Sequence, residues 1–134
     1  MRNLKRLELE IAIMERLFGH SNISYAEDGS WIKISNYKLP INECEYNLDS
    51  ATIQIVIPKD YDTSSVIEVY IDRHLKIRKK KKFVALPHTS DHKEAIGKGY
   101  IWLCFEPPDV FVSLLDFINT LKAYFTNPFN YQKL

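Results

Sequence analysis

The stretch that decides how this chain folds covers residues 86–108 and reads LPHTSDHKEAIGKGYIWLCFEPP. A Pro-His turn leads into a polar loop, and the loop runs into a short apolar segment that ends on Cys104, shortly before two prolines. A catalytic thiol must stand at the end of a held segment with its sulfur facing outward, and this stretch would present Cys104 in that way. The alternative is a buried, inert cysteine, because free cysteine is among the most buried residue types.

C-terminal to this stretch, a helix is predicted over residues 110–124. The apolar residues of its buried face recur at helical spacing, and they are Phe111, Leu114, Leu115, Ile118, Leu121 and Phe125. Residues 107–109 would begin the helix, because proline is tolerated in the first turn and an acid favours the positive end. Asn127 and Pro128 would end it.

N-terminal to the stretch, the chain predicts one helix and then a series of strands. In residues 3–18 the apolar residues recur at helical spacing and the charged residues, Glu10 among them, fall on the opposite face, which predicts a helix. Gly19 would end this helix. Strands are predicted over residues 23–26, 31–35, 51–57 and 65–71, joined by short connections. The predicted fold class is therefore α+β, with an N-terminal helix, a four-stranded antiparallel meander, an active-site loop and a C-terminal helix in one domain, residues 1–134.

Positive charge is concentrated in residues 73–82, which contain seven Lys or Arg and no acid. Such a run is typical of a solvated loop. It would otherwise serve an acidic protein partner or a nucleic-acid backbone. The formal net charge of the chain is only +1, and most aromatic residues fall in core patterns, so nucleic acid is not the expected partner.

The composition indicates a cytoplasmic protein. Two cysteines, Cys44 and Cys104, fit a reducing compartment in which thiols stay free. No apolar run is long enough for a membrane span, and the charged N-terminal segment is not a signal peptide. His88 and His92 could join a cysteine in a zinc site, but no Cys-x-x-Cys pair accompanies them, so neither a metal nor a cofactor is predicted.

The order of these elements and several short motifs resemble the ubiquitin-conjugating enzyme family, and its bacterial members in particular. The matching motifs are IVIPKDY at residues 55–61, LPH at 86–88, GYIWLC at 99–104, and the helix of residues 108–125 with NPF at 127–129. The resemblance covers residues 4–129, and the block from the Pro-His turn to Cys104 is its most specific part.

The resemblance implies that Cys104 accepts the C-terminal acyl group of a ubiquitin-like protein as a thioester and passes it to an amine. His88 would orient the acceptor amine or stabilise the tetrahedral oxyanion. The implied partners are a ubiquitin-like protein or another C-terminal acyl donor, an activating enzyme, and a target such as a nucleotidyltransferase. The implied setting is a bacterial antiphage defence or ubiquitin-like conjugation operon.

One departure from the family leaves a second interpretation open. The eukaryotic enzymes place an oxyanion-binding Asn after a His-Pro pair, whereas residues 87–89 here read Pro-His-Thr. The alternative function is therefore a catalytically silent adaptor, or binding module, of the same fold.

Overall fold

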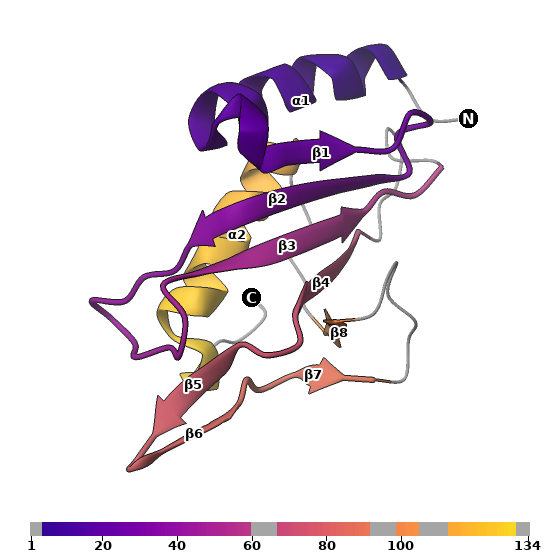
Figure 1. Ribbon diagram of the computed structural model, residues 1–134. Coiled ribbons are helices and arrows are strands. Elements are labelled where there is room, and N and C mark those ends of the chain that lie inside the picture. The colour runs from indigo at the N-terminus through magenta and orange to yellow at the C-terminus, as the bar shows by residue number, and fades with distance from the viewer. Residues whose placement is uncertain (1–3, 60–66, 92–98, 105–112, 131–134) are drawn as a thin grey trace.

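A computed structural model describes residues 4–59, 67–91, 99–104 and 113–130. It is an α+β fold with an N-terminal helix, an antiparallel sheet and a C-terminal helix, as predicted (Figure 1). The elements in chain order are α1 (Leu4–Phe18), η1 (His20–Asn22), β1 (Ile23–Tyr25), β2 (Trp31–Lys38), β3 (Ser50–Val56), β4 (Glu68–Asp72), β5 (Lys76–Lys79), β6 (Lys82–Ala85), β7 (Thr89–Ser90), β8 (Tyr100–Leu103), α2 (Leu114–Thr126) and η2 (Pro128–Asn130). None of the helices in these ranges is long and apolar enough to cross a membrane.

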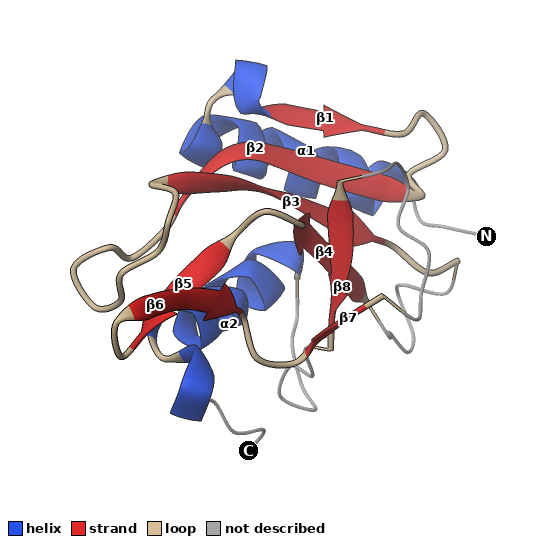
Figure 2. Ribbon diagram, turned by 60° about the horizontal axis from the view of Figure 1, so that its bottom comes forward, coloured by secondary structure: helices blue, strands red, loops and turns tan. Residues whose placement is uncertain are grey.

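The main sheet has six strands in the order β1-β2-β3-β4-β8-β7, and each neighbouring pair is antiparallel. The first four strands form the predicted meander. After β4 the chain leaves the sheet, forms the separate β5–β6 hairpin, and returns with β7 and β8 at the edge beside β4 (Figure 2). The stretch around Cys104 is therefore part of the main sheet, with Trp102 of β8 paired to Tyr70 of β4.

The prediction that residues 73–82 form a solvated loop was wrong. Most of this run belongs to the β5–β6 hairpin, in which Ile77 pairs with Val84 and Lys79 pairs with Lys82. Leu75 and Ile77 are both buried. These two apolar side chains alternate with the basic ones as a strand requires, and they anchor the base of the hairpin to the protein core.

One continuous core joins the sheet to both helices. The inward face of β3 and the residue that follows it supply Ile53, Ile55 and Ile57, which are fully buried. The core residues of the two helices are Leu7, Ile11, Met14, Leu114, Phe117, Ile118, Leu121, Tyr124 and Phe125. Burying a side chain of the size of isoleucine contributes about 1.5–3 kcal/mol, so this apolar cluster is the main source of stability.

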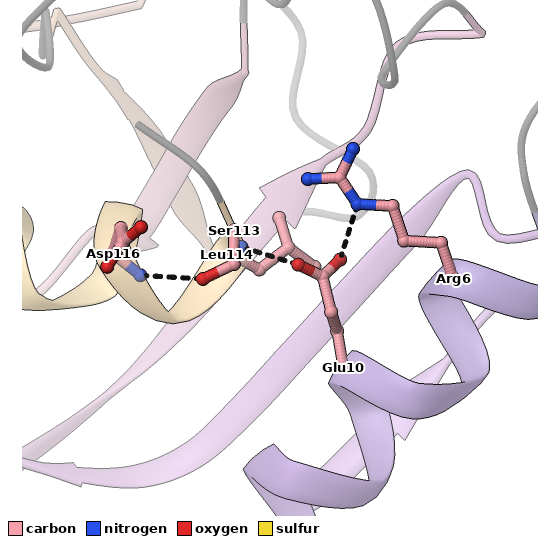
Figure 3. Close-up of polar contacts among 5 residues, drawn as sticks. All are labelled: Arg6, Glu10, Ser113, Leu114 and Asp116. Carbon is pink, nitrogen blue, oxygen red and sulfur yellow. Dashed lines mark hydrogen bonds and ion pairs between the residues drawn. The ribbon is translucent and has the colours of Figure 1, made fainter. Parts of the chain in front are cut away.

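A buried carboxylate joins the two helices. Glu10 on α1 is only 8% exposed, and its Oε1 accepts the backbone N–H of Leu114, the first residue of α2, at 3.1 Å (Figure 3). The Arg6 guanidinium lies 3.9 Å from the other carboxylate oxygen. Sequence analysis placed Glu10 on the solvent face, and this was wrong. The carboxylate is buried at the start of α2, because the first N–H groups of a helix need acceptors and favour negative charge.

The start of α2 differs from the predicted one in its capping residue. Ser113 is the N-cap, and its hydroxyl accepts the N–H of Asp116 at 3.3 Å. The predicted start of the helix, at residues 107–109, lies outside the described residues. The end of the helix agrees with the prediction, because α2 ends at Thr126 and Asn127 follows as the C-cap.

Candidate functional site: the Pro-His turn and Cys104

Cys104 lies directly after β8 and is exposed. The extended conformation of β8 sends Leu103 and Ile101 toward the core, so the next residue along the chain falls at the surface. This position contradicts the alternative of a buried Cys104. The thiol has the exposure that a nucleophile requires.

His88 is brought directly beside Cys104. The backbone N–H of Cys104 donates to the carbonyl oxygen of His88, with an N···O distance of 2.7 Å. Beyond this bond the two segments continue as the β7–β8 ladder, in which Thr89 pairs with Leu103 and Ser90 with Trp102. The turn and the cysteine thus meet at one end of a short antiparallel ladder, and both His88 and Cys104 are exposed there.

The backbone of His88 adopts a left-handed conformation, with φ at 66°. Few non-glycine residues adopt this conformation, although histidine does so more often than most. The surrounding contacts hold the turn in place: Leu86 is buried, and the Thr89 hydroxyl donates to the Leu86 carbonyl oxygen at 2.8 Å. A strained residue persists only where its surroundings determine it, and such residues are frequent at functional sites.

Tyr124 connects the turn to α2. Its hydroxyl donates to the carbonyl oxygen of Pro87 at 2.6 Å, and its ring is 1% exposed. Burial raises the pKa of Tyr124 well above its usual range, so the hydroxyl keeps its proton and remains a donor. Sequence analysis missed this contact. The available signal was a tyrosine on the apolar face of a helix, because a buried tyrosine hydroxyl usually has a hydrogen-bond partner.

Arg73, which follows β4, forms hydrogen bonds with the start of β8. Its backbone N–H donates to the Gly99 carbonyl at 2.8 Å, and its guanidinium donates to the Tyr100 carbonyl at 3.0 Å. The guanidinium also forms an ion pair with Asp91. The hydrogen bond from Arg73 lowers the pKa of Asp91, so this pair stays charged through the neutral range.

Cys44 occupies a different environment from Cys104. It is half-buried, and its Sγ donates to the backbone carbonyl of Thr126 at 3.0 Å. Burial, together with the charge of Glu43, raises the pKa of the Cys44 thiol. The two cysteines are both free thiols, and the inert description fits Cys44.

No metal centre is found in the described part of the chain. His92 lies outside the described residues, as do residues 105–108 that follow Cys104. Within residues 4–59, 67–91, 99–104 and 113–130, no three His, Cys, Asp or Glu side chains gather as metal ligands. Among the described residues, the Cys104 thiol, the His88 imidazole and the backbone of the turn lie together at this site.

The comparisons with known proteins do not extend this description. No protein-family model matches the chain, and neither a curated protein nor a solved structure matches it significantly. The resemblance to ubiquitin-conjugating enzymes stays a prediction that rests on the motifs of the sequence.

Proposed function

We propose that this protein is a cysteine-dependent acyl carrier of the ubiquitin-conjugating type. The observation that supports the proposal most is the exposed Cys104 thiol beside an exposed His88, with the backbones of the two residues joined at 2.7 Å. A carrier needs a thiol that a large acyl donor can reach, on a segment that does not move. The β7–β8 ladder and the Tyr124 contact support the second requirement, because both hold the turn beside β8.

The proposed chemistry consists of two acyl transfers. The Cys104 thiolate attacks the carbonyl carbon of the donor's C-terminal thioester, a new S–C bond forms, and the donor thiolate leaves and takes up a proton. An acceptor amine then attacks the Cys104 thioester, an amide forms, and the Cys104 thiolate is released as the amine gives up a proton. A thioester is already activated toward amines, so the second step needs positioning more than a strong base.

His88 is the group we assign to the oxyanion. Both transfers pass through a tetrahedral intermediate whose oxygen carries negative charge and needs a donor. The Cys104 N–H already donates a hydrogen bond to the His88 carbonyl, and the Thr89 hydroxyl already donates one to the Leu86 carbonyl. The His88 ring N–H is the exposed polar donor that the described turn retains, and it would replace the asparagine amide of the eukaryotic enzymes.

A small synthetic donor tests this function without any partner protein. A peptide ending in a Gly-Gly thioester is incubated with the protein, and intact mass spectrometry follows the adduct. We expect an adduct that is cleaved by hydroxylamine, absent in Cys104→Ala and unchanged in Cys44→Ala. His88→Ala should slow the transfer to a free amine more than it slows loading. An adduct that persists in Cys104→Ala would refute the carrier role.

The resemblance to bacterial members adds a genetic expectation to the proposal. A carrier works with an activating enzyme and a ubiquitin-like donor, so genes for both should lie beside this one, in an antiphage defence or conjugation operon. A Cys104 that fails to react with the peptide thioester would instead favour the silent adaptor.

A further inference from the structure

The tip of the β5–β6 hairpin concentrates positive charge at the surface. Lys79 pairs with Lys82, so Lys80 and Lys81 form a two-residue turn between them. All four side chains are exposed, and together with Val84 they line an open hollow. We call residues 79–82 the lysine tip. Within the described ranges, the lysine tip has no ion pair with any acid.

The lysine tip is unfavourable for the stability of the hairpin. Like charges directly opposite each other on paired strands repel, as Lys79 and Lys82 must. Lys80 has φ at 60°, a left-handed conformation that glycine, asparagine or aspartate usually takes in such turns. A sequence that keeps four lysines under these conditions is better explained by binding than by folding.

The base of the hairpin, in contrast, is firmly held. The Arg78 guanidinium forms an ion pair with Glu45 at 2.8 Å, and the Arg78 N–H donates to the Glu45 carbonyl at 2.8 Å. The Asn47 N–H donates to the Lys76 carbonyl at 3.0 Å. The lysine tip is therefore presented on an anchored ribbon, which lowers the entropy lost when a partner binds.

The aromatic residues that contact the hairpin's basic side chains argue against nucleic acid as the partner. Phe83 lies under the Arg78 guanidinium at 4.7 Å, and Phe129 lies under the Lys79 ammonium at 5.0 Å. Arg78 and Lys79 are consecutive in a strand, so they point to opposite faces, and the two rings cannot form one stacking platform.

The charge of the rest of the chain favours a compact acidic partner. Residues 73–82 hold seven of the eighteen Lys and Arg and none of the seventeen acids, which leaves the remainder with an excess of six acids. A nucleic acid carries charge along its whole length and would meet this repulsion. An acidic patch on a folded protein would meet the lysine tip alone.

We infer that the lysine tip docks an acidic surface of the protein that delivers the acyl group to Cys104. This inference rests on the proposed function. Lys82 precedes His88 by six residues, so this end of the tip lies within about 20 Å of the His88 backbone that holds Cys104. An acyl donor with its body on the tip would reach the sulfur with an extended C-terminal tail of about six residues.

The test compares two peptide thioesters that differ only in charge. Both end in a flexible six-residue linker and a Gly-Gly thioester, and they begin with six glutamates or with six glutamines. At 50 mM NaCl the acidic peptide should load Cys104 about tenfold faster than the neutral one, and at 300 mM NaCl this advantage should fall below about twofold. Replacing the four lysines of the tip by glutamine should remove the advantage without changing the neutral rate.

Two further variants serve as controls. Arginine at the same four positions keeps the charge and should keep the advantage of the acidic peptide. Glutamine at four exposed lysines outside the tip gives the same net charge as the glutamine variant of the tip and should also keep the advantage of the acidic peptide. These lysines are Lys5, Lys38, Lys59 and Lys122. Circular dichroism of every variant shows whether the fold is intact.

The outcomes separate the two proposals. Equal loading by both peptides would overturn the docking inference and leave the carrier function standing. If neither peptide loads, the carrier function fails, and with it the delivery role inferred for the tip. Fluorescence anisotropy of labelled peptides, and of a twelve-nucleotide oligothymidylate, is measured in parallel. Tighter binding of the oligothymidylate, lost in the glutamine variant, would assign the tip to nucleic acid and overturn the inference.

Discussion

Replacing Tyr124 by phenylalanine removes the hydrogen bond that its hydroxyl donates to the Pro87 carbonyl, which links α2 to the Pro-His turn. The ring volume is kept, and so is its edge contact with Phe125 at 5.3 Å between centroids. A lost neutral hydrogen bond costs about 0.5–1.5 kcal/mol, and an acceptor left without a partner adds to that. Because the contact with Pro87 is only part-buried, water can reach the carbonyl, so we expect a loss of about 1–2 kcal/mol in the free energy of unfolding.

The same change should be felt at Cys104. Tyr124 holds the carbonyl of Pro87, the next carbonyl along the chain is that of His88, and this one accepts the Cys104 N–H. Loosening the turn by about 1.4 kcal/mol would raise the exchange rate of the Cys104 amide about tenfold. Hydrogen exchange measured by NMR reports this rate, and the peptide-thioester assay should show slower loading of Cys104.

Tyr46→Phe is the matched control for Tyr124→Phe. The Tyr46 hydroxyl also donates to a backbone carbonyl, but this carbonyl belongs to Phe125 of α2 and not to the Pro-His turn. Tyr46→Phe should lose at least as much stability in urea titrations, because its hydrogen bond is buried, whereas only Tyr124→Phe should alter the Cys104 amide and the loading rate. Equal effects of the two variants on Cys104, or none from Tyr124→Phe, would refute the positioning argument.

Three other changes test separate parts of the structure. Iodoacetamide at pH 7 should alkylate Cys104 faster than Cys44, because a raised pKa leaves little thiolate on Cys44. Peptide mass spectrometry measures both rates, and the difference should disappear in denaturant. A difference that persists in denaturant would contradict the view that the fold makes Cys44 inert. Glu10→Gln should lower the free energy of unfolding by about 1 kcal/mol through the lost charge at the start of α2, whereas the exposed Glu8→Gln should be neutral; equal effects in urea titrations would argue against the interhelix contact. Lys80→Gly should raise the melting temperature, since glycine relieves about 1 kcal/mol of left-handed strain, and a lower melting temperature would show that the lysine side chain stabilises the turn.

Local patterns in the sequence predict the two helices and the four strands of the meander well. The alternation of Ile53, Ile55 and Ile57 indicates a strand with one dry face, and the helical spacing of residues 4–18 indicates the first helix. These features depend on neighbours in the chain, so the sequence alone contains the necessary information.

What the sequence did not reveal depends on contacts between distant segments. Glu10 reads as a surface residue of α1 until the start of α2 is placed against it. Tyr124 reads as an ordinary core residue until the Pro-His turn is placed beside it. Residues 73–82 carry so much charge that a loop was expected, although Leu75 and Ile77 in this run are buried and the run forms most of a hairpin. Tertiary partners decide each of these cases, and local spacing does not name them.

The excursion of the chain between β4 and β7 has an evolutionary consequence. The β5–β6 hairpin lies outside the main sheet, where β5 bonds to β6 and to residues 45–47, and the pairing of β4 with β8 continues the main sheet without it. Its tip can therefore be lengthened, shortened or recharged while the strands that hold Cys104 keep their alignment. If the proposed function holds, a change of companion protein would require changes only at this projection, and the strands beside Cys104 would stay as they are.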